Sequence, residues 1–152
     1  MERQPTEEDG RRALRDHVAD KAAAARAAHP EIGTGAGLEA FLADAACVRY
    51  PVTLEFDARP LEPGEFASLE PAGKRPADGF VLFLHPSLRM DERAVSMATL
   101  YYIPSVNYGE IVTSDDAELF GATAMGMEVE AYYRELCAMA NGLPPPPPHS
   151  GE

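Results

Sequence analysis

The chain has 152 residues, of which 45% are hydrophobic and 25% are charged. This length suits one domain with a single core, and this composition excludes a disordered or membrane-embedded chain. The net charge of −12 argues against nucleic acid and membrane surfaces as partners, because phosphate groups attract Lys and Arg.

The acidic side chains are concentrated in the last third of the chain. Residues 105–152 carry eight Asp or Glu and one Lys or Arg, whereas residues 1–29 carry six of each kind. An acidic surface of this kind matches a basic protein or a divalent cation as partner. Solubility alone also explains it.

The cysteine pattern indicates a reducing environment. Cys47 and Cys137 lie far apart, and neither belongs to a C-x-x-C pair or to a metal-binding spacing. We expect both to be reduced and to pack as small hydrophobic residues, which favours a cytoplasmic location. Neither the apolar segment of a signal peptide nor a membrane span is expected.

Two helices are predicted at the start of the chain. Thr6 and Asp9 have the spacing of a capping box, and the Ala-rich run that follows has a thin apolar stripe. The His29-Pro30 pair ends this helix, because a residue before proline disfavours the helical conformation. A short second helix is indicated by apolar residues at helical spacing, namely Leu38, Phe41, Leu42 and Ala45.

Three strands are predicted in the middle of the chain. Residues 48–56 alternate apolar and polar side chains. Because Pro51 has no N–H to donate within a sheet, we expect this strand to lie at a sheet edge or Pro51 to face solvent. A short strand over residues 66–69 lies between two turns rich in proline and glycine. Residues 80–84, Phe-Val-Leu-Phe-Leu, have no polar face, so they predict a central strand that is covered on both sides.

Residues 91–103 fit either a helix or a strand. Asp91 and Glu92 suit the first turn of a helix, whereas the end of the segment has strand propensity, and we prefer the helix. Residues 104–109 are expected to form a loop or turn that starts at Pro104.

Residues 110–113 predict a short extended piece. Thr113 and Asp116 then have the spacing of a helix cap, and the helical turn that they begin should end at Gly121, since glycine weakens helices.

The final helix has the most continuous apolar stripe and should pack across the sheet. Asn141-Gly142 is expected to end it in a left-handed conformation. The stripe consists of Met125, Val129, Tyr132, Tyr133, Leu136 and Ala140.

Together these elements predict an α+β fold, in which helices pack on a small, mostly antiparallel sheet of three to five strands. The expected order is α-α-β-β-β-(α or β)-α. Residues 1–30 would form a peripheral helix, residues 31–142 one core domain, and residues 143–152 a disordered polyproline tail.

The expected loop around Pro104 is the main candidate for binding. Tyr101, Tyr102, Asn107 and Tyr108 gather there, and tyrosine gives a binding loop a large rigid area with a polar tip. The chain is therefore interpreted as a non-catalytic binding or accessory protein, which presents this tyrosine-rich segment and an acidic surface to a protein partner or to a second copy of itself.

A small hydrolase or isomerase is the alternative. His85 follows the predicted central strand, and an imidazole at a strand end can act as a general acid or base. Tyr108 and Glu110 are the residues that would orient it or supply a second acid or base.

No cofactor and no metal are expected. The glycines at 33, 35 and 37 do not complete a dinucleotide-binding fingerprint, because position 38 is Leu38. The four histidines show no HExxH motif and no pairing along one helix face.

Overall fold

The computed structural model describes residues 6–144. Within them the chain forms an α+β fold with five α-helices and one three-stranded sheet, in the order α-α-β-β-β-α-α-α. The expected fold class is therefore confirmed. The elements are α1 (Glu7–Ala28), α2 (Gly35–Leu42), β1 (Val52–Phe56), β2 (Ala67–Pro71), β3 (Phe80–Leu84), α3 (Glu92–Tyr108), α4 (Ser114–Met125) and α5 (Val129–Asn141).

The sheet has the strand order β1-β3-β2, so β3 is the central strand as predicted. β3 pairs antiparallel with β2 and parallel with β1, with Leu82 opposite Leu69 on one side and Leu54 on the other. The sheet is thus mixed, whereas a mostly antiparallel one was expected. The cause is the position of β3, which enters between two strands of opposite direction. β1 is an edge strand, as Pro51 indicated.

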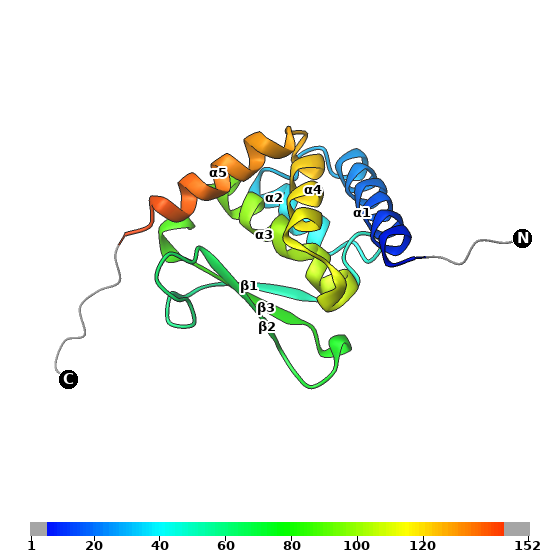
Figure 1. Cartoon of the computed structure of the whole chain (residues 1–152). Helices are drawn as coiled ribbons and strands as arrows, with labels where there is room; N and C mark the ends of the chain where they lie inside the picture. The colour runs from blue at the N-terminus through cyan, green and yellow to red at the C-terminus, as the bar shows by residue number, and fades with distance from the viewer. Residues whose placement is uncertain (1–5, 145–152) are drawn as a thin grey trace, which may run out of the picture.

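All five helices lie on one side of the sheet (Figure 1). On β3, Leu82 and Leu84 point toward them and are fully buried, whereas Val81 and Phe83 are only partly buried. The prediction that both faces of this strand are covered was wrong. Glu55 and Glu70 lie opposite Phe83 and Val81 in the neighbouring strands, so the open face remains polar enough to contact water.

α3 is the central helix of the molecule. The preference for a helix over residues 91–103 is confirmed, and Asp91 accepts a hydrogen bond from the Ala94 N–H at its start. The loop expected from Pro104 to Gly109 is wrong, because the helix continues to Tyr108. Pro104 removes one hydrogen bond from the helix, but it is itself buried, as are the apolar residues beside it. Packing therefore outweighs the local cost of proline.

α4 begins at the predicted cap, where the Thr113 hydroxyl oxygen accepts from the Asp116 N–H and the Asp116 carboxylate accepts from the Thr113 N–H. A short 3₁₀ turn (Gly109–Ile111) precedes the cap, where an extended piece was expected. The helix does not end at Gly121 but runs through it. A side chain at Gly121 would collide with the ring of Tyr132, so this glycine serves close helix packing and not termination.

α5 is shorter than its predicted stripe, because Met125 belongs to α4 and Gly126 ends that helix with a left-handed φ of 69°. Gly142 follows α5 with a φ of −87°, so the expected left-handed cap is absent there. α5 packs on α3 and α4 and not across the sheet. The predicted polyproline tail lies, from residue 145 onward, outside the described residues.

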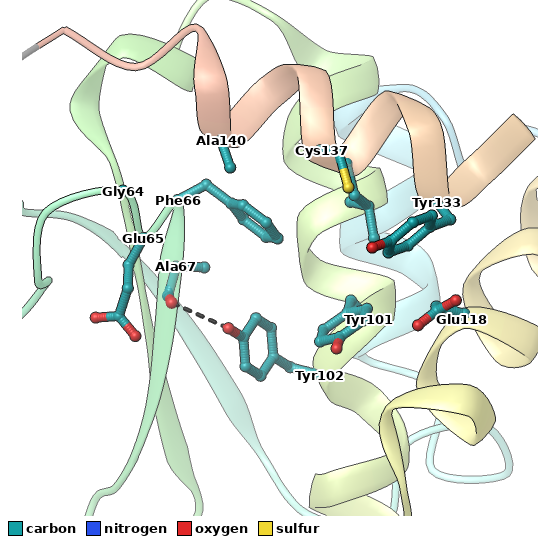
Figure 2. Close-up of a pocket in the computed structure, with 11 residues that line it drawn as sticks. Gly64, Glu65, Phe66, Ala67, Tyr101, Tyr102, Glu118, Tyr133, Cys137 and Ala140 are labelled. Carbon is teal, nitrogen blue, oxygen red and sulfur yellow. Dashed lines mark hydrogen bonds between the residues drawn. The ribbon is translucent and has the colours of Figure 1, made fainter. Parts of the chain in front are cut away.

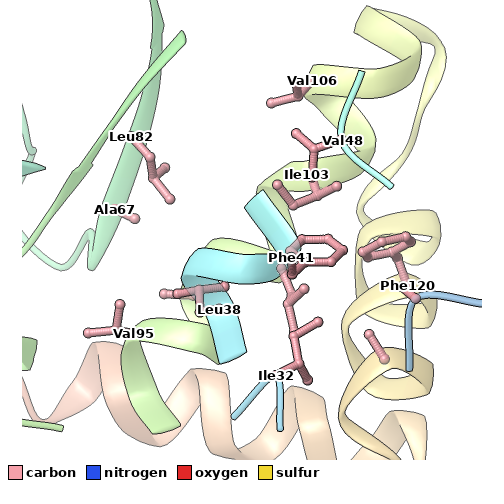
Figure 3. Close-up of a cluster of buried hydrophobic side chains, with 14 of the residues drawn as sticks. Ile32, Leu38, Phe41, Val48, Ala67, Leu82, Val95, Ile103, Val106 and Phe120 are labelled. Atoms are coloured by element: carbon pink, nitrogen blue, oxygen red, sulfur yellow. The ribbon is translucent and has the colours of Figure 1, made fainter. Parts of the chain in front are cut away.

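The main core lies between the sheet and the helices. Figure 3 shows Phe41 of α2 between Ile103 of α3 and Phe120 of α4, with Leu82 of the sheet on the other side of α2. α1 packs along α4 through the small residues of its thin apolar stripe, which allow the two helices to approach closely. Val18, Ala22 and Ala25 of this stripe are almost fully buried. Among residues 6–144, no helix is both long and apolar enough to cross a bilayer.

Candidate functional site: an aromatic and acidic pocket

A pocket of about 270 Å³ opens between the start of β2 and helices α3, α4 and α5. Figure 2 shows side chains from all four elements pointing into it. Its lining consists of Gly64, Glu65, Phe66, Ala67, Tyr101, Tyr102, Glu118, Tyr133, Leu136, Cys137 and Ala140. Four of these residues are aromatic, two are acidic, and none is Lys, Arg or His.

Two tyrosines of α3 form the floor of the pocket. The rings of Tyr101 and Tyr102 meet edge to face, with 5.3 Å between their centres. The Tyr102 hydroxyl donates a hydrogen bond of 3.0 Å to the Ala67 carbonyl, which ties α3 to the start of β2. Burial raises the pKa of Tyr102 to about 12, so this hydroxyl keeps its proton and its role as donor.

Glu118 of α4 gives the pocket a negative end. Its side chain lies near the Tyr101 ring (Figure 2). Burial and then the nearby Asp115 raise the pKa of Glu118, and burial together with these two carboxylates raises the pKa of Tyr101. Among the described residues, none forms an ion pair with Glu118. The carboxylate is therefore partly desolvated without a counter-charge, and a cation placed beside it would relieve this cost.

α5 closes the pocket from above. Tyr133 and Cys137 are one helical turn apart, and the nearby thiol raises the pKa of the Tyr133 hydroxyl. Tyr133 is 51% exposed although it belongs to the apolar stripe of this helix. Its ring is thus available to a molecule that enters from solvent.

Two of the four predicted binding residues line this pocket, and the other two make structural contacts elsewhere on α3. Tyr101 and Tyr102 line the pocket, but from a helix and not from the expected loop. Asn107 braces the segment before β1, because its amide donates to the Cys47 carbonyl at 2.9 Å and accepts from the Arg49 N–H at 2.8 Å. Tyr108 packs edge to face on His17 of α1, with 5.4 Å between ring centres.

The three residues of the alternative enzyme hypothesis are not brought together. His85 caps a short 3₁₀ turn ahead of α3, where its Nδ1 accepts from the Ser87 N–H at 3.1 Å and lies 2.8 Å from the Ser87 hydroxyl. Tyr108 and Glu110 lie at the other end of α3, a helix of 17 residues. A helix of that length spans about 25 Å. Neither residue can therefore orient the His85 ring.

A second, larger hollow of about 470 Å³ adjoins the His85 turn. Ser87 lines it, together with Arg93 of α3 and Glu135 of α5, whose side chains form an ion pair at 3.1 Å. Arg93 and Glu135 neutralise one another, and the third charged residue of the lining, Asp91, accepts a hydrogen bond from the Ala94 N–H. This hollow therefore has less need of a charged ligand than the aromatic pocket has.

A cluster of three side chains that carry metal-ligand atoms, which the sequence did not predict, lies elsewhere, at the ends of α1 and α2. His29, Asp44 and Cys47 place one ligand atom each within 4.8 Å of one another. The His29 hydrogen bond lowers the pKa of Asp44, whereas burial and then Asp44 raise the pKa of the Cys47 thiol to about 11. The missed signal was the Asp44-x-x-Cys47 spacing, which puts two ligands on one side of a turn.

The pocket also contains residues that the sequence analysis did not select. Phe66 and Glu118 carry no motif, and only the fold brings them to Tyr101. Tyr133 and Cys137 could have been noticed, because they stand four residues apart at the edge of the stripe on α5. No family model, no curated protein and no solved structure matches this chain, so the geometry of the site is the basis for its function.

Proposed function

We propose that this protein is a non-catalytic binding protein that receives an Arg or Lys side chain of a protein partner in the aromatic and acidic pocket. The observation that carries this proposal is the lining itself, which combines four aromatic rings and the Glu118 carboxylate with no basic side chain. The other acid, Glu65, is exposed and accepts a hydrogen bond from the Glu62 N–H. Such a lining favours a ligand with an apolar stem and a positive head. Arg and Lys side chains have that form.

The energies of the individual contacts support a cation as the occupant. A cation over an aromatic face gains about 0.5–2 kcal/mol, depending on how far it is desolvated. The Tyr101 and Tyr133 rings near Glu118 offer such faces, and the Glu118 carboxylate adds a charge-assisted hydrogen bond. The net charge of −12 raises the rate at which a basic partner arrives.

The size of the pocket supports a side chain over a free metabolite. Its volume of about 270 Å³ lies just below the range of about 300–1,000 Å³ that is usual for small-molecule sites. One side chain of a larger partner would fill it, while the surrounding surface supplies the remaining contacts. This role deepens the sequence interpretation, because Tyr101 and Tyr102 now act from a rigid helix.

The test compares three short peptides that differ only at the central residue: acetyl-Gly-Arg-Gly-amide, its Lys analogue and its citrulline analogue. Citrulline keeps the shape of arginine but has no charge. We expect the charged peptides to bind and the citrulline peptide to bind at least ten-fold more weakly, a difference of about 1.4 kcal/mol. Titration followed by NMR measures these weak affinities. Equal affinity for arginine and citrulline peptides contradicts the proposal.

Two matched variants locate the charge that matters. Glu118→Gln keeps the shape of the side chain and removes its charge inside the pocket, whereas Glu39→Gln does the same on the exposed surface of α2. We expect Glu118→Gln to lower the affinity for the arginine peptide about ten-fold and Glu39→Gln to leave this affinity nearly unchanged. Equal losses in the two variants would mean that only the overall charge attracts the peptide.

A second candidate function is a small hydrolase that uses His85, and the His85–Ser87 contact is the observation that favours it. The Ser87 hydroxyl lies 2.8 Å from Nδ1 and lines the larger hollow beside α3. A histidine at this distance can act as the base that activates a serine. A fluorophosphonate probe tests it, since labelling that Ser87→Ala abolishes would support this candidate and absence of labelling would remove it.

A further inference from the structure

Three side chains with different ligand atoms meet where α1 ends and α2 is followed by a turn. His29 Nε2 lies 2.8 Å from Asp44 Oδ2, and Cys47 Sγ lies 3.5 Å from the same oxygen. All three ligand atoms lie within 4.8 Å of one another. In a tetrahedral zinc site with ordinary bond lengths, neighbouring ligand atoms are about 3.4–3.6 Å apart. The cluster thus needs only small side-chain movements to surround one ion.

The backbone fixes each of the three residues. His29 is the C-cap of α1, where its N–H donates to the Ala25 carbonyl at 2.8 Å, and its ring meets the buried Phe41 edge to face. Asp44 and Cys47 belong to one turn, in which the Cys47 N–H donates to the Asp44 carbonyl at 2.9 Å. This turn places the carboxylate and the thiol on the same side.

Outer hydrogen bonds orient two of the ligands. The Ala46 N–H donates to Asp44 Oδ1 at 3.0 Å, so the other oxygen, Oδ2, is the one that faces His29 and Cys47. The Asn107 amide of α3 donates to the Cys47 carbonyl at 2.9 Å and thereby holds the turn against the core. Metal sites typically have such supporting bonds around their ligands, and these bonds limit the rearrangement that binding requires.

We propose that His29, Asp44 and Cys47 form a zinc site with three protein ligands and a fourth position open to water. An imidazole nitrogen, a carboxylate oxygen and a thiolate sulfur together suit Zn²⁺, whereas Mg²⁺ and Ca²⁺ require oxygen ligands alone. The His29 and Asp44 side chains are 13% and 31% exposed, which leaves room for the fourth ligand.

Zinc binding exchanges protons and hydrogen bonds of the cluster for bonds to the ion. The Cys47 S–H bond breaks and a Zn–S bond forms, and the thiol proton leaves to solvent. The proton on His29 Nε2 also leaves to solvent, and the neutral ring keeps its single proton on Nδ1, so that Nε2 can bind the ion. The hydrogen bonds from His29 and Cys47 to Asp44 Oδ2 are replaced by bonds from all three atoms to the ion. The negative charges of Cys47 and Asp44 then neutralise the two positive charges of Zn²⁺.

The test uses the full chain, freed of metal, in a buffer with a non-thiol reductant. Co²⁺ serves as the spectroscopic probe, since a thiolate ligand gives it a sulfur-to-cobalt charge-transfer band in the near ultraviolet. We expect one Co²⁺ per chain with such a band, and we expect one equivalent of Zn²⁺ to displace it. Competition with a chelating dye measures the zinc affinity.

Matched variants identify the ligands. Cys47→Ser should abolish the charge-transfer band and Cys137→Ser should retain it, because Cys137 is the second thiol of the chain. His29→Gln should lower the zinc affinity at least about 100-fold, which is more than the loss of a hydrogen bond around the ligands would cause. His17→Gln should leave the zinc affinity unchanged. Zinc should also raise the melting temperature of the wild type and leave that of a folded Asp44→Asn variant unchanged.

Absence of the band in the wild-type chain, or a band that survives Cys47→Ser, overturns the proposal. In that case the three residues form only a hydrogen-bond network that ties α1 to the turn after α2. Neither result bears on the aromatic pocket, because none of these three residues lines it.

Discussion

The substitution of glycine by alanine should have opposite effects on stability at Gly121 and at Gly10. Gly10 lies in α1 with nothing within 4 Å of the position that a Cβ would occupy, whereas a Cβ at Gly121 would collide with the Oη and Cζ atoms of Tyr132 and lie 2.7 Å from its Cε1. Both residues are helical, so alanine favours the backbone at each by about 0.5–1 kcal/mol. Only at Gly121 does the added methyl group meet an obstacle.

The obstacle at Gly121 cannot move at low cost. Tyr132 is fully buried, and its hydroxyl donates a hydrogen bond of 2.6 Å to the Met97 carbonyl. Adding a methyl group to a packed core costs about 1–3 kcal/mol, and displacing the hydroxyl forfeits about 1 kcal/mol more. After the helix gain is subtracted, Gly121→Ala should destabilise the protein by about 1–3 kcal/mol, while Gly10→Ala stabilises it by about 0.5–1 kcal/mol.

Chemical and thermal unfolding followed by circular dichroism measures both variants. For a chain of this size, about 1 kcal/mol corresponds to a shift of about 2–4 °C in Tm, so the two variants should differ by several degrees and in sign. In the Tyr132→Phe background, Gly121→Ala should cost less, because one of the three crowded atoms is gone. The reasoning is refuted if Gly121→Ala is as stable as the wild type or gains stability as Gly10→Ala does.

Two further predictions concern single hydrogen bonds and charges. Tyr132→Phe should lower the free energy of unfolding by about 1 kcal/mol, while Tyr133→Phe, its exposed neighbour, should change it by less than about 0.5 kcal/mol; urea unfolding distinguishes the two, and equal losses would contradict the structure. The hydrogen bond with Arg59 lowers the pKa of Asp57 from 3.8 to about 2, so its contribution to stability is present above pH 3.8 and is lost as the pH falls through about 2. Arg59→Gln should therefore reduce the acid sensitivity of Tm in this window, and an unchanged profile would show that the pair contributes nothing.

The sequence predicts those parts of the fold where local preferences and burial agree. The capping boxes at Thr6 and Thr113 and the apolar run of β3 lead to the elements that the structure contains. It misleads where packing outweighs local preference. Pro104 stays inside a helix because its surroundings are buried, and Gly121 stays inside one because Tyr132 needs the space.

The candidate site was only partly predictable for a similar reason. Tyr101 and Tyr102 were selected for their chemistry, and that selection does not depend on whether a helix or a loop carries them. Phe66, Glu118 and Tyr133 come from three other elements, and only the packing of α4 and α5 on α3 brings them to the same pocket. A single sequence contains no local signal for such an arrangement.

The direct test of the function proposed for the aromatic and acidic pocket is a map of the backbone amide shifts that the arginine peptide causes in the isotopically labelled protein. The proposed function predicts that the arginine peptide causes saturable shifts at residues 64–67 and around Tyr101, Glu118 and Tyr133. The citrulline peptide should cause much smaller shifts at the same residues. Shifts that instead follow the exposed acidic side chains of the whole surface, or that are the same for both peptides, would contradict it.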